Sequence, residues 1–165
     1  MLDRFLRWHA AKVVPDKTEE TLLNAIEEIW VSIHGPPKEL IMDGESGIMA
    51  SAKTQEYLHR KGIKPHQRGK DQHARYIERR GALFRDVVHR IQGQIKEEGL
   101  TGQISFSAIV AEGVFCGNAL LSVNGSTPYY GLYGRVPSIL PSRSQITEPS
   151  GGGTLYQSDA ADTQR

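Results

Sequence analysis

The stretch Glu39-Leu40-Ile41-Met42-Asp43 carries the pattern that decides the fold class of this chain. Three consecutive apolar residues predict a short buried strand, and the glycine that follows Asp43 is typical of a turn. The strand therefore ends on a carboxylate. Because carboxylate oxygens are the ligands that hard divalent cations prefer, Asp43 is a candidate metal-binding residue.

A second acid, Glu78, lies near the start of a long amphipathic segment. Residues 74–98 predict a helix whose apolar stripe consists of Ile77, Phe84, Val87, Val88, Ile91 and Ile95. The 34 residues between the two acids leave room for another helix and a loop, so the chain can bring Glu78 back to Asp43. Two carboxylates from a strand end and a helix start suit metal-dependent phosphodiester chemistry.

The rest of the chain predicts further elements in an alternating order. Before residue 39, the patterns indicate a strand over 4–14 and a helix that begins with the capping pair Asp16 and Glu19 and stops at 35–37. Between the two acids they indicate a short helix around 55–58, a brief edge strand at 63–64 and a loop over 65–73. A further helix is predicted over 105–123. Strands that alternate with helices favour a layered α/β domain.

Length and composition limit the possibilities. A chain of 165 residues fits one domain, which we expect over 1–141, followed by a disordered or linker tail over 142–165 that contains Gly151-Gly152-Gly153. No stretch approaches the roughly 20 apolar residues of a membrane span. The single cysteine, Cys116, excludes an internal disulfide framework and a cysteine-rich zinc site.

Positive charge is concentrated around Glu78. Residues 60–90 hold ten Lys or Arg and three acidic residues, although the whole chain has a net charge of only +1. A run of this kind often forms a solvated helix face. Because it surrounds a candidate metal ligand, phosphate binding is the better prediction for its role. The candidate DNA-binding residues are Lys70, Arg75, Arg79 and Arg85.

Several motifs, in order, resemble those of retroviral and retrotransposon integrase catalytic cores. Residues 3–8 (DRFLRW) resemble the D-x-F-S-R-W strand, residues 40–44 (LIMDG) the strand that ends in the second catalytic Asp, and residues 77–79 (IER) the V-E-R motif. Residues 126–137 (STPYYGLYGRVP) resemble the T-P-Y-x-x-x-Y-G-R-x-P signature typical of retrotransposon copies.

The resemblance implies an RNase H-like three-layer fold, with a mixed sheet flanked by helices. It also implies a site in which three acids hold two Mg²⁺ or Mn²⁺ ions, with Asp43 as the second acid and Glu78 as the third. In the family the first acid lies on an earlier strand, so that strand is expected to be missing from these residues. Asp3 occupies the following strand and is not its substitute.

The main hypothesis is an integrase catalytic-core fragment of a retrotransposon. Its partners would be DNA, both element ends and target, and further copies of itself in a dimer or higher oligomer, with no membrane. It would be intracellular, and nuclear when it acts on DNA. The alternative is a catalytically dead remnant that binds DNA or dimerises. A third hypothesis is another RNase H-like enzyme, such as a ribonuclease or DNA transposase.

Overall fold

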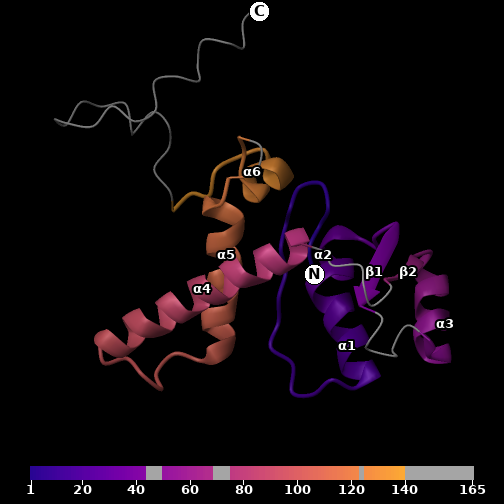
Figure 1. Cartoon of the computed structure of the whole chain (residues 1–165), viewed down its shortest axis with the longest axis horizontal. Coiled ribbons are helices and arrows are strands. Elements are labelled where there is room, and N and C mark those ends of the chain that lie inside the picture. Colours follow the sequence, from indigo (N-terminus) through magenta and orange to yellow (C-terminus); the bar gives the residue numbers. More distant parts are fainter. Residues whose placement is uncertain (44–49, 69–74, 123–124, 140–165) are drawn as a thin grey trace, which may run out of the picture.

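The computed structural model describes residues 1–43, 50–68, 75–122 and 125–139. Its elements, labelled in Figure 1, are α1 (Glu19–Ile26), η1 (Glu27–Val31), α2 (Ser32–His34), β1 (Glu39–Asp43), α3 (Ala52–Lys61), β2 (Lys64–Arg68), α4 (Arg75–Glu97), α5 (Phe106–Leu120) and α6 (Pro128–Tyr133). Helices and a short parallel sheet confirm the predicted α/β class.

Strands β1 and β2 pair in parallel, with Glu39 opposite Lys64 and Asp43 opposite Arg68. The backbone N–H of Lys64 donates to the carbonyl of Lys38 at 3.0 Å, which fixes the direction of every later peptide group in the ladder. It follows that Pro65, which has no N–H, turns its nitrogen away from β1. On β1, the N–H and C=O groups of Glu39, Ile41 and Asp43 point away from β2.

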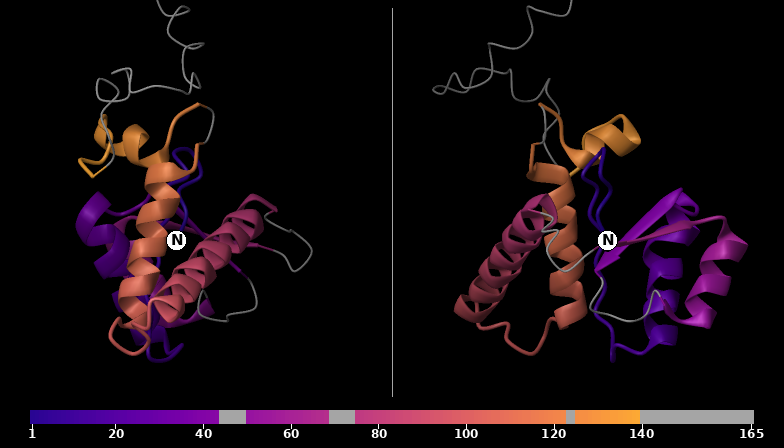
Figure 2. Two further views of the ribbon diagram at one scale, coloured as in Figure 1. Left: turned by 90° about the vertical axis from the view of Figure 1, so that its left-hand side faces the viewer. Right: turned by 45° about the vertical axis from the view of Figure 1, so that its right-hand side comes forward.

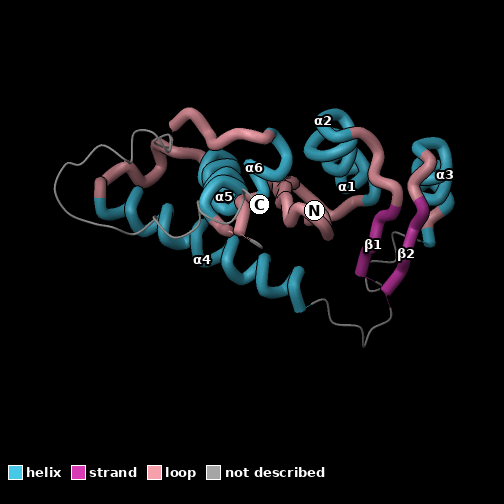
Figure 3. The backbone as a smooth tube through the Cα atoms, turned by 90° about the horizontal axis from the view of Figure 1, so that it is seen from above, coloured by secondary structure: helices cyan, strands magenta, loops and turns pink. Residues whose placement is uncertain are grey.

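One face of the sheet is covered by α1 and α3, which lie side by side (Figure 3). Their shared core consists of Leu23, Tyr57, Leu58 and Ile63, with Leu40 and Met42 of β1 packed against it. Polar pairs reinforce the contact between the helices. Glu19 accepts hydrogen bonds from Ser51 and Thr54, and Glu27 accepts them from Tyr57 and Lys61.

The helix that starts at α1 contains a π turn. Helices α1, η1 and α2 follow one another without a break, and the Ser32 N–H donates to the carbonyl of Glu27, five residues back. Thr18 caps the start, since its side chain accepts from the Thr21 N–H, while Asp16 holds Thr18 in place. The cap is therefore Thr18, and the predicted role of Asp16 as the cap was wrong.

Helices α4 and α5 pack against each other on the other side of the N-terminal segment (Figure 2). Gly113 of α5 permits a close approach, because a Cβ there would lie 3.0 Å from a Val88 methyl group and 3.2 Å from the Phe84 ring. Both helices were predicted, and they end within a few residues of the predicted boundaries.

Helix α6 lies over the N-terminal segment. Thr127 caps it, Pro128 occupies its first turn, and Gly134 ends it in the left-handed conformation. The rings of Tyr129 and Tyr133 pack on Trp8, with centroids 6.4 and 5.7 Å from the indole. Tyr129 and Tyr133 of the 126–137 motif thus pack against the N-terminal segment, whereas Tyr130 is exposed.

Two local predictions were wrong. Residues 4–14 form no strand, because the Asp3 carboxylate accepts the Phe5 and Leu6 N–H groups and reverses the chain into a tight hairpin, with one antiparallel bridge between Leu2 and His9. Residues 64–68 form β2, so the edge strand predicted at 63–64 continues over residues 65–68, where a loop was predicted. The polar composition of that segment concealed it, since a strand on a sheet edge does not need an apolar face.

The predicted tail over 142–165 lies outside the described residues, so the boundary at 141 stays a prediction. Within the described part of the chain, no helix is long and apolar enough to cross a membrane.

Candidate functional site

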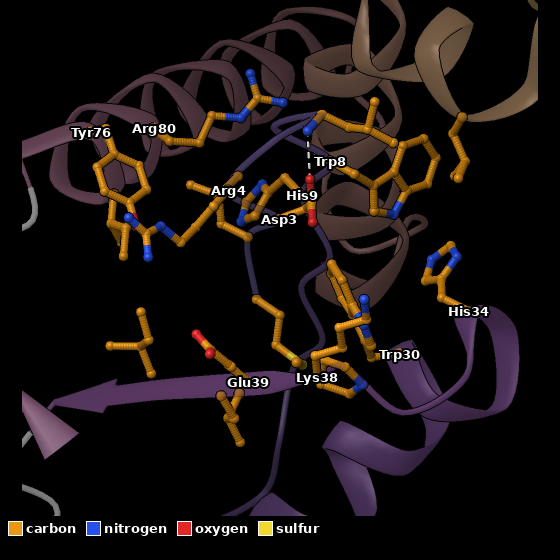
Figure 4. Close-up of a pocket in the computed structure, with 18 of the residues that line it drawn as sticks. Asp3, Arg4, Trp8, His9, Trp30, His34, Lys38, Glu39, Tyr76 and Arg80 are labelled. Carbon is orange, nitrogen blue, oxygen red and sulfur yellow. Dashed lines mark hydrogen bonds between the residues drawn. The ribbon is translucent and has the colours of Figure 1, made fainter. Parts of the chain in front are cut away.

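A pocket of about 780 Å³ opens between the start of β1, the N-terminal hairpin and the first turns of α4. Figure 4 shows the hairpin residues above β1, with Tyr76 and Arg80 of α4 on one side and Trp30 and His34 on the other. The lining combines apolar and aromatic side chains with cationic ones, among them Arg4, Lys38 and Arg80, and two acids, Asp3 and Glu39.

Asn118 fixes the hairpin to the helices behind it. This α5 residue is 1% exposed, and its amide makes two hydrogen bonds to the backbone of His9: Oδ1 accepts the His9 N–H at 2.9 Å, and Nδ2 donates to the His9 carbonyl at 2.8 Å. The side-chain amide thus makes the same pair of hydrogen bonds to His9 that the backbone of a neighbouring strand would make. It holds one wall of the pocket at a fixed distance from α5.

Arg80 joins the same network from α4. It is 8% exposed, and its Nη2 donates to the Gly117 carbonyl at 2.7 Å and to Asn118 Oδ1 at 3.3 Å. From the sequence, Arg80 was predicted only to contribute to the positive charge of residues 60–90. Its spacing from Ile77 and Phe84 places it on the apolar stripe of the helix, and that spacing was the available signal of burial.

The two candidate acids come from β1 and α4, which both contribute residues to the lining of this pocket. Asp43 is the last residue of β1, and its side chain lies outside the described part of the structure. Glu78 is exposed and stands in the first turn of α4. In Figure 4 β1 runs toward the side of the pocket where Tyr76 of α4 lies.

Among the described residues, no group of three or more His, Cys, Asp or Glu side chains could hold a metal ion. The predicted pair supplies two carboxylates from separate elements. That donor set fits Mg²⁺ chemically, because Mg²⁺ in proteins commonly takes one or two carboxylates and completes its shell with water and substrate phosphate.

The candidate DNA-binding residues are described to different extents. Arg79 and Arg85 are exposed on α4, and Arg85 folds back along the helix, so that its Nη1 lies 3.5 Å from where a Cβ on Gly81 would be. Arg75 begins α4, but its side chain is outside the described part, as is all of Lys70.

Arg7, which was not among the candidate residues predicted from the sequence, stands out for its backbone. It is the one non-glycine residue with positive φ in the described part of the chain, at 62°, a conformation that costs about 1 kcal/mol for a residue with a Cβ. Its guanidinium lies over the ring of Tyr76, 4.6 Å from the centroid. Tyr76 is two residues before Glu78.

His9 lies beside this network with its ring against Phe84, the centroids 4.9 Å apart. Burial lowers the pKa of His9 to about 4, and the positive charges of the N-terminal amine and Arg80 add to this effect. The fold therefore favours the neutral imidazole.

The His9 pKa predicts a loss of stability in mild acid. Between pH 6.5 and about 4 the unfolded chain binds a proton at His9 that the folded chain does not, so the free energy of unfolding falls as the pH is lowered. We expect a loss of about 2 kcal/mol, after discounting for partial exposure of the ring. Urea unfolding at the two ends of this range measures it. His9→Gln should lose that part of the pH dependence, whereas the exposed His89→Gln should keep it.

Comparison with solved structures identifies the architecture. The chain superposes on the HTLV-2 integrase catalytic core domain, solved in complex with magnesium in a trimeric form, with a TM-score of 0.62, 16% identity and 78% of each chain covered. The BIV integrase catalytic core gives 0.59, with 17% identity and 74% of each chain. The fold is that of an integrase catalytic core. It belongs to the RNase H-like α/β class, as predicted.

The integrase-like fold also matches a larger assembly. In the simian T-cell lymphotropic virus intasome, solved with the PP2A regulatory subunit B56 gamma, the match has a TM-score of 0.57 and 15% identity, and covers 85% of this chain and 48% of the viral one. No protein-family model and no curated protein sequence matches the chain. At these identities the likeness establishes the fold alone.

Proposed function

We propose that this chain is the catalytic-core part of a retrotransposon integrase, which binds DNA and, in its intact form, joins DNA strands by polynucleotidyl transfer. The observation that carries the proposal is the integrase-like fold, with Asp43 at the end of β1 and Glu78 in the first turn of α4. The motifs of residues 77–79 and 126–137 favour the same function.

In this proposal Asp43 and Glu78 hold Mg²⁺ or Mn²⁺ together with a further acid. The HTLV-2 integrase core was solved in complex with magnesium, which makes a divalent cation the natural candidate. A bound pair of such ions would supply Lewis-acid activation of the attacking and leaving oxygens. The arginines on α4 would hold the DNA phosphates beside the two carboxylates.

Partners and location complete the proposal. The HTLV-2 core was solved in dimeric and trimeric forms, so we propose a homo-oligomer here as well. DNA, both element ends and target, is the proposed substrate, and the nucleus is the proposed place of action.

A second candidate is a remnant that binds DNA or dimerises without catalysis. What favours it is that the described residues contain no group of three or more His, Cys, Asp or Glu side chains that could hold a metal ion. The two candidates differ in one assay. An active core joins labelled duplex ends to a target DNA in Mg²⁺ or Mn²⁺, whereas a remnant binds the duplex and gives no joined product.

Both candidates predict DNA binding through α4. Arg79→Gln combined with Arg85→Gln should weaken binding to a labelled duplex by about tenfold at low salt, and should reduce the slope of log affinity against log salt by about two units. Fluorescence anisotropy measures both quantities. The double variant Arg90→Gln with Lys96→Gln removes the same charge from the far end of α4 and should change affinity far less. Equal losses in the two double variants would show that only net charge matters.

A further inference from the structure

We propose that Arg7, held on Tyr76, is a DNA-phosphate contact beside the first turn of α4. No sequence motif assigned it this role, and the inference rests on the proposed DNA binding. Its basis is one juxtaposition, in which a guanidinium from the N-terminal hairpin lies over the ring of Tyr76, 4.6 Å from the centroid and two residues before Glu78.

The backbone of Arg7 supplies the first argument. The hairpin places residue 7 at φ 62°, a position that glycine or asparagine occupies without difficulty and that arginine occupies only under strain. A turn needs no long cation at such a position. Strained backbone persists mainly where the side chain that it presents has a use.

The hydrogen-bonding state of Arg7 supplies the second argument. In the described part of the chain, no carboxylate lies within ion-pair distance of its guanidinium, and the Asp3 carboxylate nearby accepts backbone N–H groups. An arginine stacked on an aromatic face keeps its edge free. That edge carries the forked N–H donors, which match two phosphate oxygens.

Neighbouring charge supports the same partner. Arg4, also on the hairpin, is exposed and makes no ion pair with a described residue, and Figure 4 shows it at the Tyr76 end of the pocket. Two guanidinium groups on one short hairpin repel each other unless an anion lies between them or near them. A phosphate of a DNA strand that runs past the start of α4 would offset the repulsion between the guanidinium groups of Arg4 and Arg7.

The rigidity of the hairpin makes the contact specific in position. Asn118 holds the backbone of His9, two residues after Arg7, and the Asp3 N–H donates to the Trp8 carbonyl at 2.8 Å. The guanidinium is therefore presented from a fixed base. A phosphate bound there would set how the DNA strand lies relative to Glu78.

The test uses a substitution that separates function from folding. Arg7→Gly removes the side chain and relieves the positive φ, so its melting temperature should stay close to that of the wild type. Its affinity for a fluorescein-labelled duplex should fall about tenfold, and the salt slope should fall by about one unit. Lys17→Gly, which removes the same charge from an exposed loop before α1, should leave affinity within about twofold.

A second pair of variants tests the stacking. Tyr76→Phe keeps the ring and should bind like the wild type, whereas Tyr76→Leu should lose part of the affinity that Arg7→Gly loses, because the guanidinium is no longer held. Arg7→Lys keeps the positive charge but lacks the forked N–H donors, so its affinity for the duplex should lie between those of the wild type and Arg7→Gly.

The binding results for the wild type and for Arg7→Gly distinguish the Arg7 contact from the proposed DNA binding on which it rests. A wild-type chain that binds no duplex overturns the proposed function, and this inference with it. A wild type that binds, with Arg7→Gly binding equally well, overturns this inference alone. An Arg7→Gly variant whose melting temperature falls steeply assigns Arg7 a structural role and also overturns it.

Discussion

Glu78→Gln is expected to abolish DNA joining while leaving DNA binding intact. The change removes a negative charge but preserves the size of the side chain, and Glu78 is exposed in the first turn of α4, so we expect the fold to be retained. Loss of a metal-binding carboxylate should lower the joining rate by about a thousandfold or more, which corresponds to roughly 4 kcal/mol of transition-state stabilisation. Asp43→Asn should have the same effect from the end of β1.

The measurement is a joining assay with labelled duplex ends in Mg²⁺ and in Mn²⁺, run on the longest polypeptide that contains this chain and joins DNA. Glu97→Gln, the same change near the far end of α4, is the matched control and should join normally. Anisotropy on each variant checks that DNA is still bound. If Glu78→Gln joined DNA at the wild-type rate, Glu78 would not be a metal ligand.

Asn118→Ala is expected to lower the free energy of unfolding by more than the other single substitutions in this chain for which we predict an effect on stability. It leaves the N–H and carbonyl of His9 without their partners and takes one acceptor from Arg80, all inside the contact between hairpin and helices. Unsatisfied buried polar groups cost about 1–3 kcal/mol each, so we expect a loss of about 3 kcal/mol. Domains of this size are stable by only about 5–15 kcal/mol.

Urea unfolding followed by circular dichroism measures this loss. Asn24→Ala, on an exposed position of α1, is the matched control and should be neutral or slightly stabilising, because alanine is the better helix former. A change below about 0.5 kcal/mol in Asn118→Ala would mean that the two bonds to His9 contribute nothing net.

The sequence predicted best those elements whose pattern is local. The apolar run before Asp43 gave β1, the stripe from Ile77 onward gave α4, and the Thr-Pro start and terminal Gly134 agree with α6. Those elements carry Asp43 and Glu78, so the backbone positions of the candidate acids could be predicted. Their catalytic roles remain predictions.

What could not be predicted depends on contacts distant in sequence. The hairpin at Arg7 arises because the Asp3 side chain competes for backbone N–H groups, which overrides the strand-forming residues around it. Asn118 meets His9 across 109 positions, and no short window of sequence contains both. Strand β2 has a polar sequence, so the sequence indicated only a brief edge strand at 63–64, and the register with β1 shows that the strand covers 64–68.

The π turn at Glu27–Val31 affects how this chain must be aligned with others. A π turn accommodates one more residue than an α turn, so a helix that acquires one keeps its two ends in place only by taking in a single extra residue. An alignment that treats 19–34 as uninterrupted α-helix will be one position out of step on one side of it. His34, which lies beyond the turn and forms part of the pocket wall, would then be compared with the wrong position.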